Sequence, residues 1–126
     1  MKKLSILLLF ILTGLSAKAQ QQEHTILETS VYKDSIEKKK VLLLDVRTPE
    51  EFKAGHIDRA INYNYLDTEN FKKQVDSLSK NRPVYIYCRS GNRSGRAADL
   101  MKEMGFTKIF DLKGGYLGWE AFTEED

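Results

Sequence analysis

The single cysteine of the chain, Cys88, lies where an apolar run gives way to a polar loop. The four residues before it, 84–87, are β-branched or aromatic, which is typical of a buried strand. Polar and turn-forming residues follow at 89–94, and apolar residues then recur at helical spacing up to Gly105. Ser94 is placed to cap this helix. The thiol is therefore predicted to leave the end of a strand and to face a loop that leads into a helix N-terminus.

This arrangement suits nucleophilic attack on an anion. Inward-pointing amides of the loop and the positive end of the helix dipole together attract negative charge. Arg89 and Arg93 add two positive charges, and such surroundings can lower the pKa of a cysteine to roughly 3.5–7.5. A lone cysteine can instead be a small buried hydrophobe. The strand end, the glycine-containing loop, the two arginines and the following helix favour a catalytic thiolate at Cys88.

The first nineteen residues predict a secretory signal peptide. A basic start precedes an apolar run of 12 residues at positions 4–15, and Ala17-Lys18-Ala19 is a small-x-small cleavage site. A run of this length is too short to cross a bilayer, which takes about 20 residues, although an uncleaved anchor remains the alternative. We expect a signal peptide at 1–19, one domain at 20–126, and an exported protein, periplasmic or secreted, without stable membrane association after cleavage.

The charge and the cysteine content narrow the function further. The whole chain of 126 residues has a net charge of +2, but residues 20–126 contain 17 basic and 18 acidic residues, a net charge of −1. The basic excess of the full chain therefore gives no support to nucleic-acid or membrane binding. One cysteine cannot form an internal disulfide, and an unpaired thiol in an exported protein risks oxidation. Its presence indicates a function for Cys88.

Strands are expected to alternate with helices along the mature chain. Thr29 or Ser30 can cap the first helix, with Val31, Ile36 and also Tyr32 as candidates to turn inward. Residues 20–24 are polar and are expected to be disordered. Strands are expected near residues 25–27, 41–46, 60–63, 84–87 and 108–112. Helices are expected over about 29–38, after Thr48, over 68–80, after the cysteine loop, and at 116–122, where aromatic residues would dock the last one.

The residues from Thr48 onward contain several signals for the start of a helix. Thr48 can cap the helix, Pro49 occupies its first position, and Glu51 can reach back to form a capping box. The helix is expected to be short and to end before Gly55. His56 follows in a short loop and is expected to be a hydrogen-bonded structural residue. No second histidine or carboxylate stands at metal-ligand spacing, so no metal site is expected.

The alternation of strands and helices predicts an α/β fold. Right-handed crossovers then give a largely parallel sheet with helices on both faces, and the apolar strand at 41–46 fits burial on both sides. Ligands in such folds bind outside the carboxyl ends of the strands. Arg47 and Cys88 both follow strand ends, so they can converge in one pocket although they are 41 positions apart.

Four blocks of residues occur in a definite order between residues 25 and 122. They are LDVR with PEEF at 44–47 and 49–52, GHI with AIN at 55–57 and 60–62, CRSGNRS at 88–94, and LKGG at 112–115 with Trp119. Together these blocks resemble a single-domain rhodanese, and the resemblance covers essentially the whole mature chain. It implies a five-stranded, mostly parallel sheet with helices on both faces, together with sulfurtransferase chemistry.

The resemblance also implies roles for individual residues. Cys88 would be the sulfur-carrying nucleophile, and Asp45 and Arg47 would support the loops around it. The best-known two-domain rhodaneses place a lysine and a further arginine near a larger loop, and this chain departs from that pattern, which leaves its physiological donor open. The residues expected to bind the substrate are Arg47, Arg89, Ser90, Gly91, Asn92, Arg93 and Ser94.

The predicted reaction proceeds in two steps. The Cys88 thiolate attacks the outer sulfur of a small anionic donor such as thiosulfate, sulfite leaves, and a persulfide remains on the protein. A thiophilic acceptor, cyanide or a thiol, then takes the terminal sulfur in a ping-pong reaction. Loop amides and arginines would stabilise the developing charge. We expect a monomer that needs no cofactor and no metal and binds no nucleic acid; a protein could also serve as the sulfur acceptor.

Two other functions are compatible with parts of this pattern. A non-enzymatic rhodanese-like persulfide carrier, or a sensing or binding module, would have the same sequence, and turnover with small donors would distinguish it. A cysteine phosphatase also uses a thiolate in an amide cradle, but its usual spacing is Cys-x5-Arg. Here the sixth residue after Cys88 is Ser94 and the fifth is Arg93, so the loop is one residue short.

Overall fold

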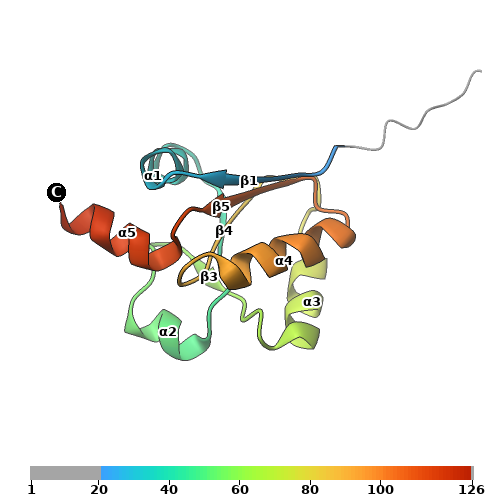
Figure 1. Ribbon diagram of the computed structural model, residues 1–126. Coiled ribbons are helices and arrows are strands. Elements are labelled where there is room, and N and C mark those ends of the chain that lie inside the picture. The colour runs from blue at the N-terminus through green and yellow to red at the C-terminus, as the bar shows by residue number, and fades with distance from the viewer. Residues whose placement is uncertain (1–20, 126) are drawn as a thin grey trace, which may run out of the picture.

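A five-stranded, fully parallel sheet forms the centre of the protein (Figure 1). The computed structural model describes residues 21–125, so the predicted signal peptide at 1–19 lies outside the described residues. The strand order is β1-β5-β4-β2-β3, which places the strand before Cys88 in the middle of the sheet. The strands are β1 (Glu23–Leu27), β2 (Leu42–Asp45), β3 (Ile61–Asn62), β4 (Val84–Tyr87) and β5 (Lys108–Leu112).

Helices cover both faces of this sheet, as the sequence predicts. On one face lie α1 (Thr29–Lys38) and α5 (Gly115–Glu124), and on the other lie α3 (Thr68–Asp76) and α4 (Asn92–Glu103). The short α2 (Pro49–Ala54) follows β2 at its carboxyl end. Two separate apolar layers result. The α3/α4 side includes Phe71, Val75, Ala97, Ala98 and Met101, and the α1/α5 side includes Tyr32, Ile36, Tyr116 and Trp119.

The first strand begins earlier than the sequence predicts. Glu23 and His24, expected to be disordered, extend β1 because β5 supplies a parallel partner for every residue of that strand, beginning with Glu23 opposite Lys108. In the next element, Val31 is 51% exposed rather than turned inward. The other two candidates, Tyr32 and Ile36, are four positions apart and form the buried stripe of α1.

The N-cap residue predicted from the sequence is confirmed for α2 and is wrong for α1 and α4. The capping box of α2 is present: the Thr48 side chain accepts the Glu51 N–H, and the Glu51 carboxylate accepts the Thr48 N–H. In α1 the N-cap is Glu28 without a side-chain cap, so neither Thr29 nor Ser30 has that role. In α4 the N-cap is Gly91, not Ser94.

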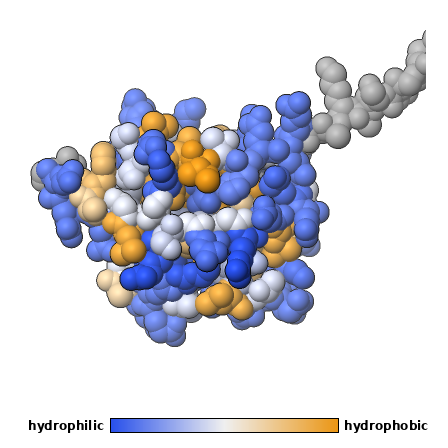
Figure 2. Space-filling view, viewed as in Figure 1, coloured by the Kyte–Doolittle hydropathy of each residue, from blue (hydrophilic) through white to orange (hydrophobic). Residues whose placement is uncertain are grey.

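The surface fits a domain whose apolar residues are mostly internal. Figure 2 shows a mainly hydrophilic face on which small hydrophobic patches are separated by polar side chains. Among the described residues, none of the helices is long and apolar enough to span a membrane.

Candidate active site

The sheet brings the two predicted strand ends together. Asp45 of β2 pairs with Tyr87 of β4, and the Val46 N–H donates to the Tyr87 carbonyl at 3.0 Å, which continues the ladder beyond β2. Arg47 and Cys88 follow these neighbouring residues directly. Arg47 and Cys88 therefore follow neighbouring strands at the same edge of the sheet.

The N-terminus of α5 holds the first residues of the cysteine loop. The Tyr116 N–H donates to the Cys88 carbonyl at 2.8 Å, and the Leu117 N–H donates to the Arg89 carbonyl at 3.1 Å. This approach is so close that a Cβ on Gly115 would lie 2.5 Å from the Arg89 carbonyl carbon, and Gly115 also has a φ of +58°. Only glycine meets both demands. The turn before α5 therefore sets the position of the loop that begins at Cys88.

The Cys88 sulfur lies in a small hydrogen-bonded ring. The residue is only 1% exposed, and its Sγ accepts the Gly91 N–H at 3.0 Å. The thiol donates to Ser94 Oγ at 3.3 Å, and the Ser94 hydroxyl donates to the Gly91 carbonyl at 3.2 Å. Gly91, with a φ of +109°, turns its amide toward the sulfur. One loop amide thus stabilises negative charge on the sulfur, in keeping with the predicted cradle.

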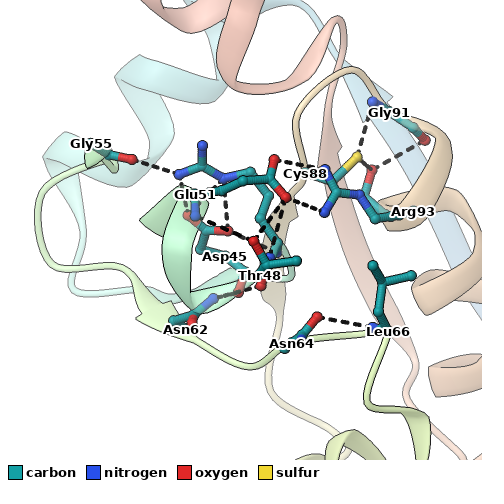
Figure 3. A network of polar contacts seen from close by, with 12 residues as sticks. Asp45, Thr48, Glu51, Gly55, Asn62, Asn64, Leu66, Cys88, Gly91 and Arg93 are labelled. Atoms are coloured by element: carbon teal, nitrogen blue, oxygen red, sulfur yellow. Dashed lines mark hydrogen bonds and ion pairs between the residues drawn. The ribbon is translucent and has the colours of Figure 1, made fainter. Parts of the chain in front are cut away.

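Arg93 is directed at a carboxylate on another element. Its guanidinium makes two hydrogen bonds to Glu51 of α2, at 2.5 and 2.8 Å, and Figure 3 shows Glu51 between Arg93 and Thr48. These hydrogen bonds are the main reason that the pKa of Glu51 falls from its ordinary 4.5 to about 2. Glu51 likewise raises the pKa of Arg93. Arg93 therefore joins α2 to the cysteine loop, a partnership that the sequence analysis did not predict.

A second arginine–carboxylate pair is more deeply buried than the Arg93–Glu51 pair. Arg47 is 4% exposed and bonds the fully buried Asp45 through Nε at 3.0 Å and through its terminal nitrogen at 2.7 Å. The same terminal nitrogen donates to the Gly55 carbonyl at 2.7 Å, and the guanidinium carbon lies 4.3 Å from the centre of the Tyr116 ring. Arg47 thereby ties β2, the end of α2 and α5 together. Arg47 and Asp45 are thus buried together beside the loops that the resemblance implied they would support.

The other predicted residues lie at the periphery of this core. His56 is exposed, stacks on Phe52 at 3.7 Å and pairs through Nδ1 with the Phe52 carbonyl at 3.0 Å, as expected of a structural histidine. Arg89, Ser90 and Asn92 are exposed on the loop. Arg89 is thus the loop arginine that is not held by Glu51.

A cavity of about 190 Å³ opens beside the cysteine loop. Arg47 lines it and Cys88 does not, so this cavity is not the shared pocket that was predicted for the two residues. Two larger hollows, of about 410 and 360 Å³, share Lys40, Val41 and Arg82 and lie away from Cys88, so volume alone does not locate the site. The lining of the smaller cavity includes Arg47, Glu51, Arg89 and Tyr116.

Some residues around the sulfur were missed by the sequence analysis or given another role. Asn62 donates to the Asp45 and Arg47 carbonyls at 3.1 and 2.9 Å and so attaches β3 to the site. Ser94 was expected to cap a helix but contacts the sulfur. The sequence could not predict these contacts, because the hydrogen-bond partners of Asn62 and Ser94 are brought near them only by the tertiary fold. Among residues 21–125, no group of three His, Cys, Asp or Glu side chains is arranged to hold a metal ion.

Comparison with known proteins agrees with this geometry. Residues 28–122 match the family model described as rhodanese-like domain. The chain belongs to the rhodanese-like domain family. In that family it is 37% identical over 79 residues to a protein named sulfurtransferase from Allochromatium vinosum, with 63% of this chain and 71% of the relative covered.

Other rhodanese-like relatives are longer proteins with different names. A tRNA uridine(34) hydroxylase from Pelagibacter ubique is 28% identical over 106 residues, which cover 84% of this chain but only 35% of that protein. The chain spans less than two thirds of the length of several curated relatives that it matches. A rhodanese-like domain protein from Staphylococcus aureus has a crystal structure with a TM-score of 0.66 at 30% identity, covering 75% of this chain and 90% of that one.

The Glu51–Arg93 pair predicts a pH-dependent contribution to stability. Because the folded pKa of Glu51 is lowered, the contribution is complete above pH 4.5 and is lost as the pH falls toward 2. Glu51→Gln is expected to lower the free energy of unfolding at pH 7 by roughly 1–3 kcal/mol, discounted for partial exposure. Urea titrations at several pH values should show this difference shrinking between pH 4.5 and 2.

The exposed neighbour Glu50 provides the matched control. It occupies the same first turn of α2, so Glu50→Gln removes one charge from that turn without touching Arg93. Its effect should be small at every pH. A Glu51→Gln deficit that stays constant from pH 7 to pH 2 would show that the ion pair is not its source.

Proposed function

We propose that this rhodanese-like domain is a sulfurtransferase that carries sulfane sulfur on Cys88. The supporting observation is the placement of the Cys88 sulfur against the Gly91 amide, at the base of a loop between β4 and α4. Relatives named sulfurtransferase fit this function. The donor is a small anion of the thiosulfate class, and the acceptor is cyanide or a thiol.

The reaction follows from the ring of hydrogen bonds at the sulfur. The Cys88 thiolate attacks the outer sulfur of thiosulfate, a sulfur–sulfur bond forms, and the donor's own sulfur–sulfur bond breaks. Sulfite takes the electron pair of the broken bond and leaves, so Cys88 retains a persulfide. The Gly91 N–H stabilises negative charge on the sulfur in both states. Cyanide then attacks the terminal sulfur, thiocyanate departs, and the thiolate returns.

Intact-mass analysis after incubation with thiosulfate tests this directly. We expect the mass of the protein to increase by one sulfur atom and to return to its starting value when cyanide is added. Cys88→Ser should show neither change, because no base lies beside the substituted hydroxyl to activate it. A protein that never gains sulfur from thiosulfate would contradict the donor class. Loading without turnover would favour the alternative of a persulfide carrier.

Arg89 is the side chain best placed to attract the donor. It is exposed, it lines the cavity beside the loop, and Arg93 is already held by Glu51. Arg89→Ala should reduce the rate of sulfur loading from thiosulfate about tenfold, since an exposed charge-assisted contact contributes about one decade. The loading rate can be measured by quenching the thiosulfate reaction at successive times and determining the fraction of persulfide by intact-mass analysis. Discharge by cyanide should change less.

A matched arginine elsewhere controls for net charge. Arg96 is exposed on α4 and lines a different hollow with Asp99 and Glu103. Arg96→Ala should leave loading within about twofold of the wild-type rate, because screening weakens distant surface charges. If both variants lose loading equally, the effect is one of overall charge and Arg89 does not bind the donor.

We also propose that the protein works after export. The basis is the sequence of residues 1–19, with its basic start, its apolar run and Ala17-Lys18-Ala19. N-terminal sequencing of the protein from its native host is expected to begin at or near Gln20. A chain that keeps its first residues and stays in the cytoplasmic fraction would contradict export while leaving the sulfur chemistry intact.

A further inference from the structure

Two neighbouring hollows lie at the end of the sheet opposite Cys88. They are the hollows of about 410 and 360 Å³ that share Lys40, Val41 and Arg82. Val41 directly precedes β2 and Pro83, which lines the second hollow, directly precedes β4, so both hollows lie at the amino ends of the strands. Cys88 follows the carboxyl end of β4, and the rise per residue of a strand places it roughly 16 Å from Pro83. A small ligand bound here would therefore not contact the sulfur.

Every charged residue that lines these two hollows is basic. The basic residues are Lys39, Lys40, Arg59, Arg82 and Lys108. The hollow of about 340 Å³ beside α4 is different, because Lys72 and Arg96 share its lining with Asp99 and Glu103. A concave surface lined by one sign of charge concentrates ions of the opposite sign. The two hollows are therefore suited to an anion, and the hollow beside α4 is not.

These basic side chains have no carboxylate partner in the protein. Among residues 21–125, none of the five forms an ion pair, whereas five other lysines do. Asp58 precedes Arg59 in the chain and Glu23 is opposite Lys108 in the sheet, but neither carboxylate lines a hollow. The positive charge of the cluster is left for a ligand to neutralise.

Arg59 is held at the first hollow by the fold itself. Among the described residues it is the only non-glycine with a positive φ, +68°, a conformation that residues with a Cβ seldom adopt. Its guanidinium donates to the Ile36 carbonyl in the last turn of α1 at 3.1 Å. A guanidinium has five N–H donors, so this single hydrogen bond fixes the group and leaves other donors for an anion. Backbone strain of this kind is often found at ligand sites.

The rest of the lining is apolar, and part of it is recessed. Ile36, Leu42 and Leu43 line the first hollow and are 3%, 8% and 4% exposed, while Ile61 is 43% exposed beside them. A flat membrane surface does not reach side chains at this depth, and the phosphates of a nucleic acid have no use for them. Mainly apolar cavities of about 300–1,000 Å³ with a few charged groups are typical of small-molecule sites. The chemistry matches a ligand with an apolar body and an anionic head.

We propose that these two hollows form a binding site for a small organic anion with an apolar body, of which medium-chain carboxylates are the simplest examples. Lys40 and Arg82 line both hollows, so the carboxylate head lies near them. The apolar body extends along Val41 toward Ile61, which both line the first hollow. The site is separate from the cysteine loop, and its existence does not depend on sulfur transfer.

Titration with octanoate, followed by the NMR shifts of the backbone amides, tests the site. Saturable shifts are expected at Val41, Ile61 and Lys108, with a dissociation constant of about 1–10 mM for so small a ligand. Hexanoate should bind up to about fifteenfold more weakly, because each buried methylene contributes about fourfold. Octanol, which has the same apolar body without the charge, should bind more weakly than octanoate. Shifts that do not saturate, or octanol binding as tight as that of octanoate, would overturn the proposal.

A pair of double variants separates the site from the net charge of the protein. Lys40→Gln with Arg82→Gln removes the two basic residues shared by the hollows and should weaken octanoate binding about tenfold. Lys72→Gln with Arg96→Gln removes the same charge from the hollow beside α4 and should leave binding within about twofold. Equal weakening in both proteins would show a general charge effect and contradict the site.

A second matched pair tests the apolar wall. Ile61 and Leu66 are both exposed apolar residues, at 43% and 62%, so each tolerates a polar side chain. Ile61→Glu places a negative charge in the first hollow and should abolish octanoate binding, whereas Leu66→Glu should leave it unchanged. Retained binding in Ile61→Glu contradicts the site. Binding of anionic phosphatidylglycerol vesicles or of a glutamate-rich peptide, without binding of octanoate, would assign this surface to a membrane or a protein and overturn the proposal. None of these measurements involves a sulfur donor, so their outcome is independent of the proposed sulfurtransferase activity.

Discussion

The site depends on the hydrogen bonds between the first amides of α5 and the carbonyls of Cys88 and Arg89. The first N–H groups of a helix have no partner within the helix, and here the cysteine loop supplies two of those partners. The close approach is open only to glycine at position 115. With its first two carbonyls held in this way, the loop presents the Gly91 amide to the sulfur. A nucleophile on a central strand is thereby positioned by a helix near the end of the chain.

Charge pairing gives the same region its rigidity. Asp45 pairs with Arg47 and Glu51 pairs with Arg93, so two of the three arginines predicted at the site are committed to carboxylates. Both pairs are partly or fully buried, where breaking a pair costs more than it would on the surface. Arg89 is not held by Glu51 and is the arginine that we propose attracts the donor, while the sulfur itself contacts backbone and hydroxyl groups. This division of labour fits a rhodanese-like domain that moves a small anion's sulfur.

Local patterns predicted much of the structure because they depend on short-range physics. The strands at 84–87 and 108–112 have the predicted bounds, and Thr48 with Glu51 forms the predicted capping box. Ser94 shows where such reasoning fails. Its residue type suits an N-cap, but Gly91 adopts the left-handed conformation at that position, and Ser94 enters the helix and contacts the sulfur. The prediction that Val31 turns inward is also wrong, because the packing of Tyr32 and Ile36 decides which face of α1 is buried.

The sequence by itself determined the alternation of strands and helices, the parallel sheet, the placement of Arg47 and Cys88 at one edge of that sheet, and the family. These follow from periodicity, turn chemistry and the rule that parallel strands end at one edge. Only the tertiary structure decided the partners of the charged and hydroxyl groups. Arg93 meets a carboxylate 42 residues away, and His24 meets one 87 residues away. Such pairings have no local signature, because they depend on which loops and strands the folded sheet brings to the same place.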